Sequence, residues 1–263
     1  MSIDFSKQNN LQEKLELVRT LYKRFNDNYG NLIDMNIVEE AISNIVVANE
    51  DMSNIPADDK KLLENGMAAE LSLVDNKIYI KNNTILLDLV HEILHYISKD
   101  HNGMIGPVVE LYPDEVFAKN MKKFGEKRTV EQIAQLDESF TCFMAELIYP
   151  EFENKNRYRF GQKCIKKYYD GLTDNTVDGK FLFNAYINGD IKATKKFMDS
   201  FGDDFYDLID VIEQNYNALY YIIVKKQKNP SMSEEQVDLM IKKAVLETKK
   251  HSMMESSDSK KVY

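Results

Sequence analysis

One segment, residues 85–98, constrains the fold more than any other part of the chain. Its length and its apolar side chains on almost every side predict a buried helix. Two histidines four residues apart, His91 and His95, interrupt the apolar surface, and Glu92 follows the first of them. Burying these polar side chains costs free energy unless each one finds a partner. The surroundings of this helix must therefore compensate two imidazoles and a carboxylate.

The pattern His91-Glu92-Ile93-Leu94-His95 suits a metal site. Residues four apart share a helix face, so both imidazoles can bind one zinc ion. Glu92 is rotated to the side, where it can accept a proton from water and pass it to a leaving amine. A solvated helix face or hydrogen-bonded core histidines are the alternative interpretation. The apolar surroundings favour the metal, so we expect Zn²⁺ as the cofactor and Glu92 as the catalytic base.

Helices dominate the rest of the sequence. The clearest strand, residues 77–81, alternates polar and apolar residues just before the helix that carries His91 and His95. Thr84 is expected to cap that helix, residues 99–113 are expected to form a loop, and Gly171 is expected to end a helix. Helices are predicted at residues 6–26 (capped by Ser6), 34–48, 85–98, 114–124, 129–149 (opened by a capping box of Thr129 and Gln132), 156–170, 177–187, 191–201, 205–226 and 234–250.

The order of strand and motif in residues 77–147 resembles the zincin superfamily of metallopeptidases. The resemblance implies that the strand at residues 77–81 lies at a sheet edge beside the active site, where it can pair with an extended substrate. It further implies a peptidase that uses three protein ligands to hold zinc. Two branches of the superfamily differ in where the third ligand lies.

In the gluzincin branch, of which thermolysin is the type, a glutamate on a later helix completes the site. Residues 136–141, with the sequence Leu-Asp-Glu-Ser-Phe-Thr, resemble the segment that supplies this ligand, which makes Glu138 the candidate. Ala134, Thr141 and Ala145 share a helix face with Glu138, and their small size permits close approach of another helix. An ordinary exposed glutamate is the alternative interpretation of Glu138.

In the metzincin branch, the third ligand is a histidine six residues after the second. Here that position holds His101. Ser98, however, replaces the glycine that permits a sharp turn after His95. No methionine turn is evident, because Met104 comes too early and Met144 lies within a predicted helix. Glu138 is therefore the favoured third ligand, with His101 as the alternative.

The resemblance to gluzincins implies two supporting roles beside the three zinc ligands. Many gluzincins carry an aspartate a turn after the third ligand, where it orients a zinc-bound histidine, but here that place holds Thr141 and Cys142. Asp88, Asp137 or a backbone carbonyl can take that role instead.

Gluzincins also need a donor to the oxyanion, usually a tyrosine or histidine from a downstream helix. Tyr158 is the first candidate here, with Arg157 and Arg159 as alternatives. A packing or surface tyrosine is the simpler interpretation of Tyr158.

Composition restricts the kinds of binding partner and the cellular compartment that we expect. The net charge of -9 argues against a nucleic-acid or anionic-membrane partner. Cys142 and Cys164 are too few for a disulfide framework, which favours a reducing compartment. Residues 1–10 lack the apolar stretch of a secretory signal, and the longest apolar run, residues 218–224, is too short to span a bilayer. We therefore expect a cytoplasmic protein.

These observations predict an α+β chain that is mainly α-helical. A zincin-like catalytic part with a small sheet is expected at residues 1–149, a helical part that completes the cleft at 150–250, and a disordered tail at 251–263. One domain over residues 1–250 is the alternative.

The expected function is zinc-dependent hydrolysis of a peptide or protein substrate, including the case of a regulatory protease with one dedicated partner. The alternative is a catalytically silent zinc-binding protein that serves interaction or regulation. The intact Glu92 argues against a silent protein, because a binding module needs no base.

Overall fold

The chain is mainly helical with one small sheet, as the sequence predicts. A computed structural model describes residues 10–48, 52–124, 126–151, 158–174, 178–202 and 204–228. The helices are α1 (Leu11–Tyr29), α2 (Met35–Ser43), α3 (Ala57–Glu64), α4 (Leu86–Ile97), the short 3₁₀ turn η1 (Lys99–His101), α5 (Ile105–Leu111), α6 (Asp114–Phe124), α7 (Glu126–Ile148), α8 (Arg159–Asp174), α9 (Lys180–Asn188), α10 (Ile191–Asp199) and α11 (Asp204–Lys228). The helix predicted at residues 234–250 and the tail lie outside the described residues.

The sheet has three strands in the order β1-β3-β2: β1 (Ile45–Val47), β2 (Ala69–Leu71) and β3 (Ile78–Ile80). β3 confirms the strand predicted at residues 77–81, but it is the central strand, so the expected edge position is wrong. β1 pairs parallel with it and β2 antiparallel. The edge beside the candidate site therefore belongs to β2.

Two of these strands were not expected from the sequence. The helix predicted at residues 34–48 ends at Ser43, and the β-branched residues of β1 pair with β3 instead. β2 contains only three residues, too few for a pattern of alternation to stand out. Long-range pairing, and not local pattern, creates both strands.

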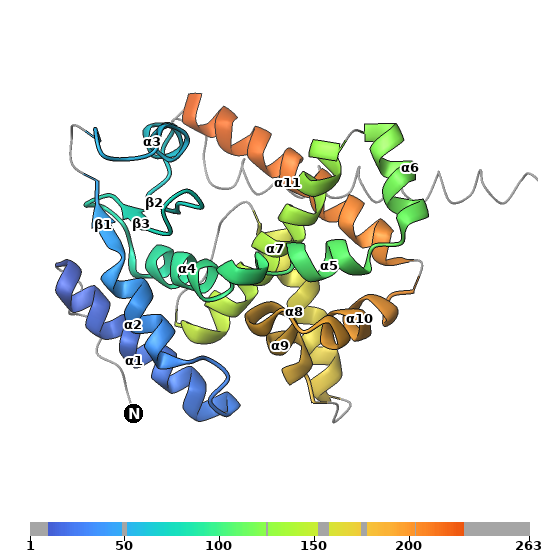
Figure 1. The fold of residues 1–263 in the computed structure, drawn as a ribbon, viewed down its shortest axis with the longest axis horizontal. Coiled ribbons are helices and arrows are strands. Elements are labelled where there is room, and N and C mark those ends of the chain that lie inside the picture. Colours follow the sequence, from blue (N-terminus) through green and yellow to red (C-terminus); the bar gives the residue numbers. More distant parts are fainter. Residues whose placement is uncertain are drawn as a thin grey trace, which may run out of the picture.

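Helix α4 occupies the centre of the molecule and is buried as predicted. In Figure 1 it runs between the sheet with α1–α3 on one side and α5, α6 and α8–α10 on the other. It contacts β2, α1, α2 and α7. Leu89, Val90, Ile93 and Leu94 are fully buried, and the Tyr22 hydroxyl of α1 donates to the carbonyl oxygen of Val90 at 2.9 Å. This packing fixes how α4 is rotated and hence where its histidines point.

The N-terminal ends of two helices differ from the sequence prediction. Asn10 caps α1, whose first residue is Leu11, while the predicted cap Ser6 lies outside the described residues. α4 begins at Leu86 after Ile85, and Thr84 donates its hydroxyl to backbone carbonyls of residues 68 and 81 instead of capping the helix.

The segment predicted as a loop at residues 99–113 is also different, since it contains η1 and α5. Pro107 lies in the first turn of α5, where its missing N–H costs nothing.

Two further boundaries are wrong along α7 and α8. α7 begins at Glu126, so Thr129 and Gln132 form no capping box and are buried within the helix. Gly171 lies inside α8 and does not end it. α8 and α11 both pack on α7, which places the later helices against the element that carries Glu138. Within the described part of the chain, no helix is long and apolar enough to cross a membrane.

Two glycines give a matched test of this packing. A methyl group at Gly106 would lie well inside van der Waals contact with the carbonyl oxygen of His101, because α5 approaches η1 closely. Gly106→Ala should lower the free energy of unfolding by about 1–3 kcal/mol. A methyl group at Gly171, on the open side of α8, meets no atom within 4 Å. Gly171→Ala should stabilise the protein by about 0.5–1 kcal/mol through its higher helix propensity. Urea unfolding monitored by circular dichroism measures both, and equal effects would contradict the packing of η1 against α5.

Candidate metal centre

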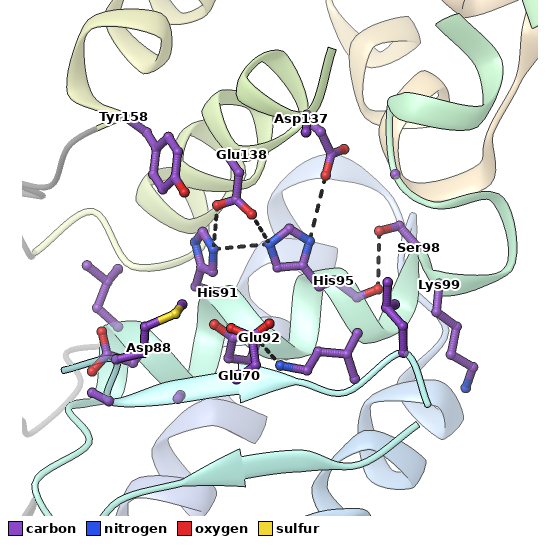
Figure 2. A pocket seen from close by; sticks show the side chains of 18 of the residues that line it. Glu70, Asp88, His91, Glu92, His95, Ser98, Lys99, Asp137, Glu138 and Tyr158 are labelled. Carbon is purple, nitrogen blue, oxygen red and sulfur yellow. Dashed lines mark hydrogen bonds and ion pairs between the residues drawn. The ribbon is translucent and has the colours of Figure 1, made fainter. Parts of the chain in front are cut away.

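Three side chains from two helices converge at one point. The Nε2 atoms of His91 and His95 on α4 lie 3.1 Å apart. The Glu138 carboxylate of α7 faces both, with Oε2 3.3 Å from His91 Nε2 and Oε1 3.3 Å from His95 Nε2. One donor atom from each residue lies within 4.8 Å of the other two. His91, His95 and Glu138 therefore lie close enough to bind one metal ion (Figure 2).

The small face predicted on α7 explains how Glu138 reaches α4. Thr141 and Ala145 are fully buried, and Ala134 lines the cavity beside the three side chains. α4 and α7 are thus in direct contact, with the carboxylate projecting between them. The bulky side chains of Leu136 and Phe140 are also buried, within the hydrophobic core.

Opposite charges favour an ionised Glu138 and protonated His91 and His95. Burial raises the pKa of Glu138, but the imidazoles of His95 and His91 outweigh it and hold that pKa well below its usual range. Burial lowers the pKa of His91, yet the Cys142 thiol and Glu138 together raise it well above its ordinary value. Burial likewise lowers the pKa of His95, but Glu138 outweighs it and raises this pKa above its ordinary value. The cluster therefore favours protonated imidazoles beside an ionised carboxylate, and a bound cation would have to take the place of these protons.

The second nitrogen of each imidazole faces a partner that can orient the ring. His95 Nδ1 lies 3.8 Å from Asp137 Oδ2, and the other oxygen of Asp137 accepts the backbone N–H of Met104 at 2.6 Å. Burial raises the pKa of Asp137 to about 6. His91 Nδ1 lies 3.8 Å from the Cys142 sulfur. Partners of this kind orient the rings of metal-bound histidines.

Asp88, the other expected orienting residue, has a different local role. Its Oδ2 accepts the backbone N–H of Ile85 at 3.1 Å and so caps the first turn of α4. Of the two aspartates, Asp137 is the one that lies against an imidazole of the triad.

Glu92 lies beside the triad and outside it. Its side chain is buried, and Oε2 accepts the backbone N–H of Leu71 in β2 at 2.8 Å. Burial raises the pKa of Glu92, against the opposing effect of His91 and His95. A carboxylate with one oxygen anchored and a raised pKa is suited to accept and return a proton near neutral pH.

The triad opens into a cavity of about 700 Å³. Its lining includes β2, the beginning of α4, the segment after α4, and Tyr158 just before α8. Figure 2 shows the hydroxyl of Tyr158 directed towards Glu138, and its ring stacks on Tyr216 at 5.4 Å between centroids. Of the alternative oxyanion donors, Arg157 lies outside the described residues, and only the backbone of Arg159 is described.

His101 lies away from the triad. It belongs to η1, and its Nε2 donates to the backbone carbonyl of Tyr186 in α9 at 2.8 Å. Its ring lies so close to Gly189 that a methyl group there would overlap it. The structure therefore does not bring His101 to the other two histidines, because the chain after α4 carries this ring onto α9.

Sequence reasoning missed the contribution of β2. Glu70 and the flanking residues Ala69 and Leu71 line the cavity, and Leu71 anchors Glu92. The pattern of residues 66–71 does not indicate a strand at the cavity. Their role depends on pairing with β3, which follows β2 after a short connection.

Comparisons with protein-family models, curated proteins and solved structures gave no match. The chemistry of these side chains is therefore the basis for a functional assignment.

The third ligand can be tested by metal content. Glu138→Ala removes the carboxylate that faces both imidazoles, and zinc affinity should fall by more than about a hundredfold. His101→Ala should leave one zinc per chain, because His101 points to α9. Elemental analysis after dialysis against zinc, with competition by a chromophoric chelator, measures both. The reverse result would assign the third ligand to His101.

Zinc affinity should also depend on pH in a definite direction. The imidazoles must lose their protons to bind metal, and their pKa values are raised, so protons compete more strongly than at free histidines. Affinity should therefore fall as pH falls from about 8 to about 6, by about tenfold per unit for each imidazole that is protonated. His101→Ala should show the same slope. An affinity independent of pH over this range would exclude imidazole ligands.

Proposed function

We propose that this protein is a zinc-dependent metallopeptidase of the gluzincin type, in which His91, His95 and Glu138 hold Zn²⁺ and Glu92 is the general base. One observation carries the proposal: two imidazoles and a carboxylate converge at the wall of an open cavity, with an anchored, buried carboxyl beside them. Catalytic zinc sites use three protein ligands and keep one position open.

The donor set fits the metal. Two imidazole nitrogens and one carboxylate oxygen are common ligands of zinc, whereas a site for Mg²⁺ or Ca²⁺ is built from oxygen atoms. When bound, the metal supplies Lewis-acid chemistry that activates water towards a carbonyl group. The protein holds the ligands ready through Asp137 and Cys142, which face the outer nitrogens of the two rings.

Glu92 performs the proton transfers. Leu71 holds one carboxylate oxygen, which leaves Oε1 to accept a proton from the attacking water and to deliver it to the leaving amine. The raised pKa of Glu92 brings both halves of this exchange closer to neutral pH.

The edge of β2 supports a peptide as the substrate. The Ser72 N–H donates to Lys77 and the Lys81 N–H donates to Ala68, which sets the backbone groups of Glu70 and of the flanking residues 68 and 72 towards β3. In an antiparallel pair, the backbone groups of the intervening residues, Ala69 and Leu71, point away from the partner strand. They face the cavity. Glu92 already accepts the Leu71 N–H, so an extended peptide can add as a further strand through the backbone groups of Ala69 and the carbonyl oxygen of Leu71.

Tyr158 is the proposed donor to the oxyanion. It lines the cavity on the α7 side, and its hydroxyl is directed towards the triad (Figure 2). A phenol donates a hydrogen bond without changing its own charge, which suits an oxygen that becomes negative during the reaction.

The decisive variant is Glu92→Gln. The amide cannot accept the proton, so hydrolysis of a casein-derived peptide mixture should slow by about two to four orders of magnitude, while zinc content and melting temperature stay near those of the wild type. Glu110→Gln, an exposed glutamate on α5, is the matched control and should retain full activity. Equal rates in the wild type and Glu92→Gln would remove Glu92 as the base. Zinc binding with no hydrolysis by the wild type would favour the catalytically silent alternative.

A further inference from the structure

Glu70 is a cavity side chain without a part in the proposed reaction. It is the central residue of the edge strand β2, and its side chain lies beside Glu92 (Figure 2). Its neighbours Ala69 and Leu71 present the strand edge that faces the cavity. A peptide paired with this edge would place one of its residues next to Glu70, because cross-strand neighbours lie within side-chain reach.

The other four carboxyl groups of the cavity have partners. Asp88 caps α4 and Glu92 accepts from Leu71. Asp137 accepts from Met104, and Glu138 faces the two imidazoles. Within the described part of the chain, no hydrogen bond or ion pair reaches the carboxyl group of Glu70.

The described lining of the cavity offers Glu70 no lysine or arginine that is available to pair with it. Lys99 is the one lysine or arginine among the described lining residues. Its Nζ lies 3.2 Å from Glu40 Oε1 and 3.5 Å from the centre of the Tyr96 ring. It is therefore already engaged on the outer side of α4.

Burial and nearby carboxyl groups both disfavour the charged form of Glu70. Burial raises its pKa to about 8, and Glu92, Glu138 and Asp59 act in the same direction against His95. Asp59 of α3 is itself buried, and its Oδ2 has no hydrogen-bond partner in the described structure. A partly buried carboxyl near other carboxyl groups is costly to ionise, and a positive group beside it offsets that cost.

We infer that Glu70 determines specificity by binding a cationic group of the substrate, an ammonium or a guanidinium, next to the bond that is cleaved. The inference rests on the proposed peptidase function. The cationic group belongs to a residue that lies along β2: a lysine or arginine side chain, or the free amino group of a peptide whose first residue lies there. Both sources share one chemistry and are separated by the test.

The probes are internally quenched alanine peptides that carry lysine, arginine, norleucine or glutamate at one position at a time. Norleucine matches the length of lysine without its charge. The wild type should favour the best cationic peptide over its norleucine counterpart by about tenfold or more in kcat/KM, as expected for a charge-assisted hydrogen bond. Glu70→Gln should abolish this ratio, Glu70→Asp should retain part of it, and Glu110→Gln should retain all of it. Zinc content is measured for every variant.

Acetylation of the peptides separates the two sources of positive charge. A preference for lysine or arginine over norleucine assigns the side chain, whereas faster cleavage of the norleucine peptide with a free α-amino group than of its acetylated form assigns the α-amino group. Either result supports the inference. Absence of any preference in the wild type overturns it, as does a preference that survives in Glu70→Gln, since glutamine still donates a hydrogen bond but carries no charge.

A binding measurement keeps this inference distinct from the proposed function. If zinc-loaded wild type cleaves none of the peptides, the peptidase proposal fails. Calorimetry then compares lysine and norleucine peptides on Glu92→Gln and on the double variant Glu70→Gln/Glu92→Gln. Tighter binding of the lysine peptide that depends on Glu70 supports the cation site, and equal binding of both peptides overturns it.

Discussion

The contact between α4 and α7 is the constraint on which the rest of the structure depends. It places a carboxylate against two imidazoles in largely apolar surroundings, where unpaired polar groups are costly. Three neighbouring segments reduce that free-energy cost. α7 presents small residues so that Glu138 can approach, the segment after α4 supplies the Met104 amide to Asp137, and β2 supplies the Leu71 amide to Glu92.

The turn between η1 and α5 packs closely against α7 beside these side chains. The chain turns after α4 through Gly103. Its φ of +57° is a backbone conformation that residues with a side chain rarely adopt. A methyl group at this position would overlap the Asp137 carboxylate. The turn thus brings the Met104 amide onto the residue that faces His95, so the beginning of α5 positions a side chain of α7.

The sequence alone predicts the parts of the site that depend on local periodicity. The four-residue spacing of His91 and His95 and the small face around Glu138 need only the geometry of a helix, and both helices are present. It does not predict β2, because three residues carry no periodic signal and become a strand only through β3. The position of His101 is likewise decided by packing, since nothing near this residue in the sequence indicates that α9 will accept its ring. Local pattern therefore identifies His91, His95 and Glu138, which lie close enough to bind a metal ion, whereas long-range contacts decide the walls of the cavity.

The hydrogen bond from Leu71 to Glu92 determines when the Glu92 side chain loses its conformational entropy. A free glutamate side chain explores many rotamers, and confining it for proton transfer is unfavourable. Here the edge strand confines it as soon as the sheet and α4 come together. The freedom of this side chain is lost when the protein folds, so a peptide bound as proposed would spend none of its binding energy on restricting it.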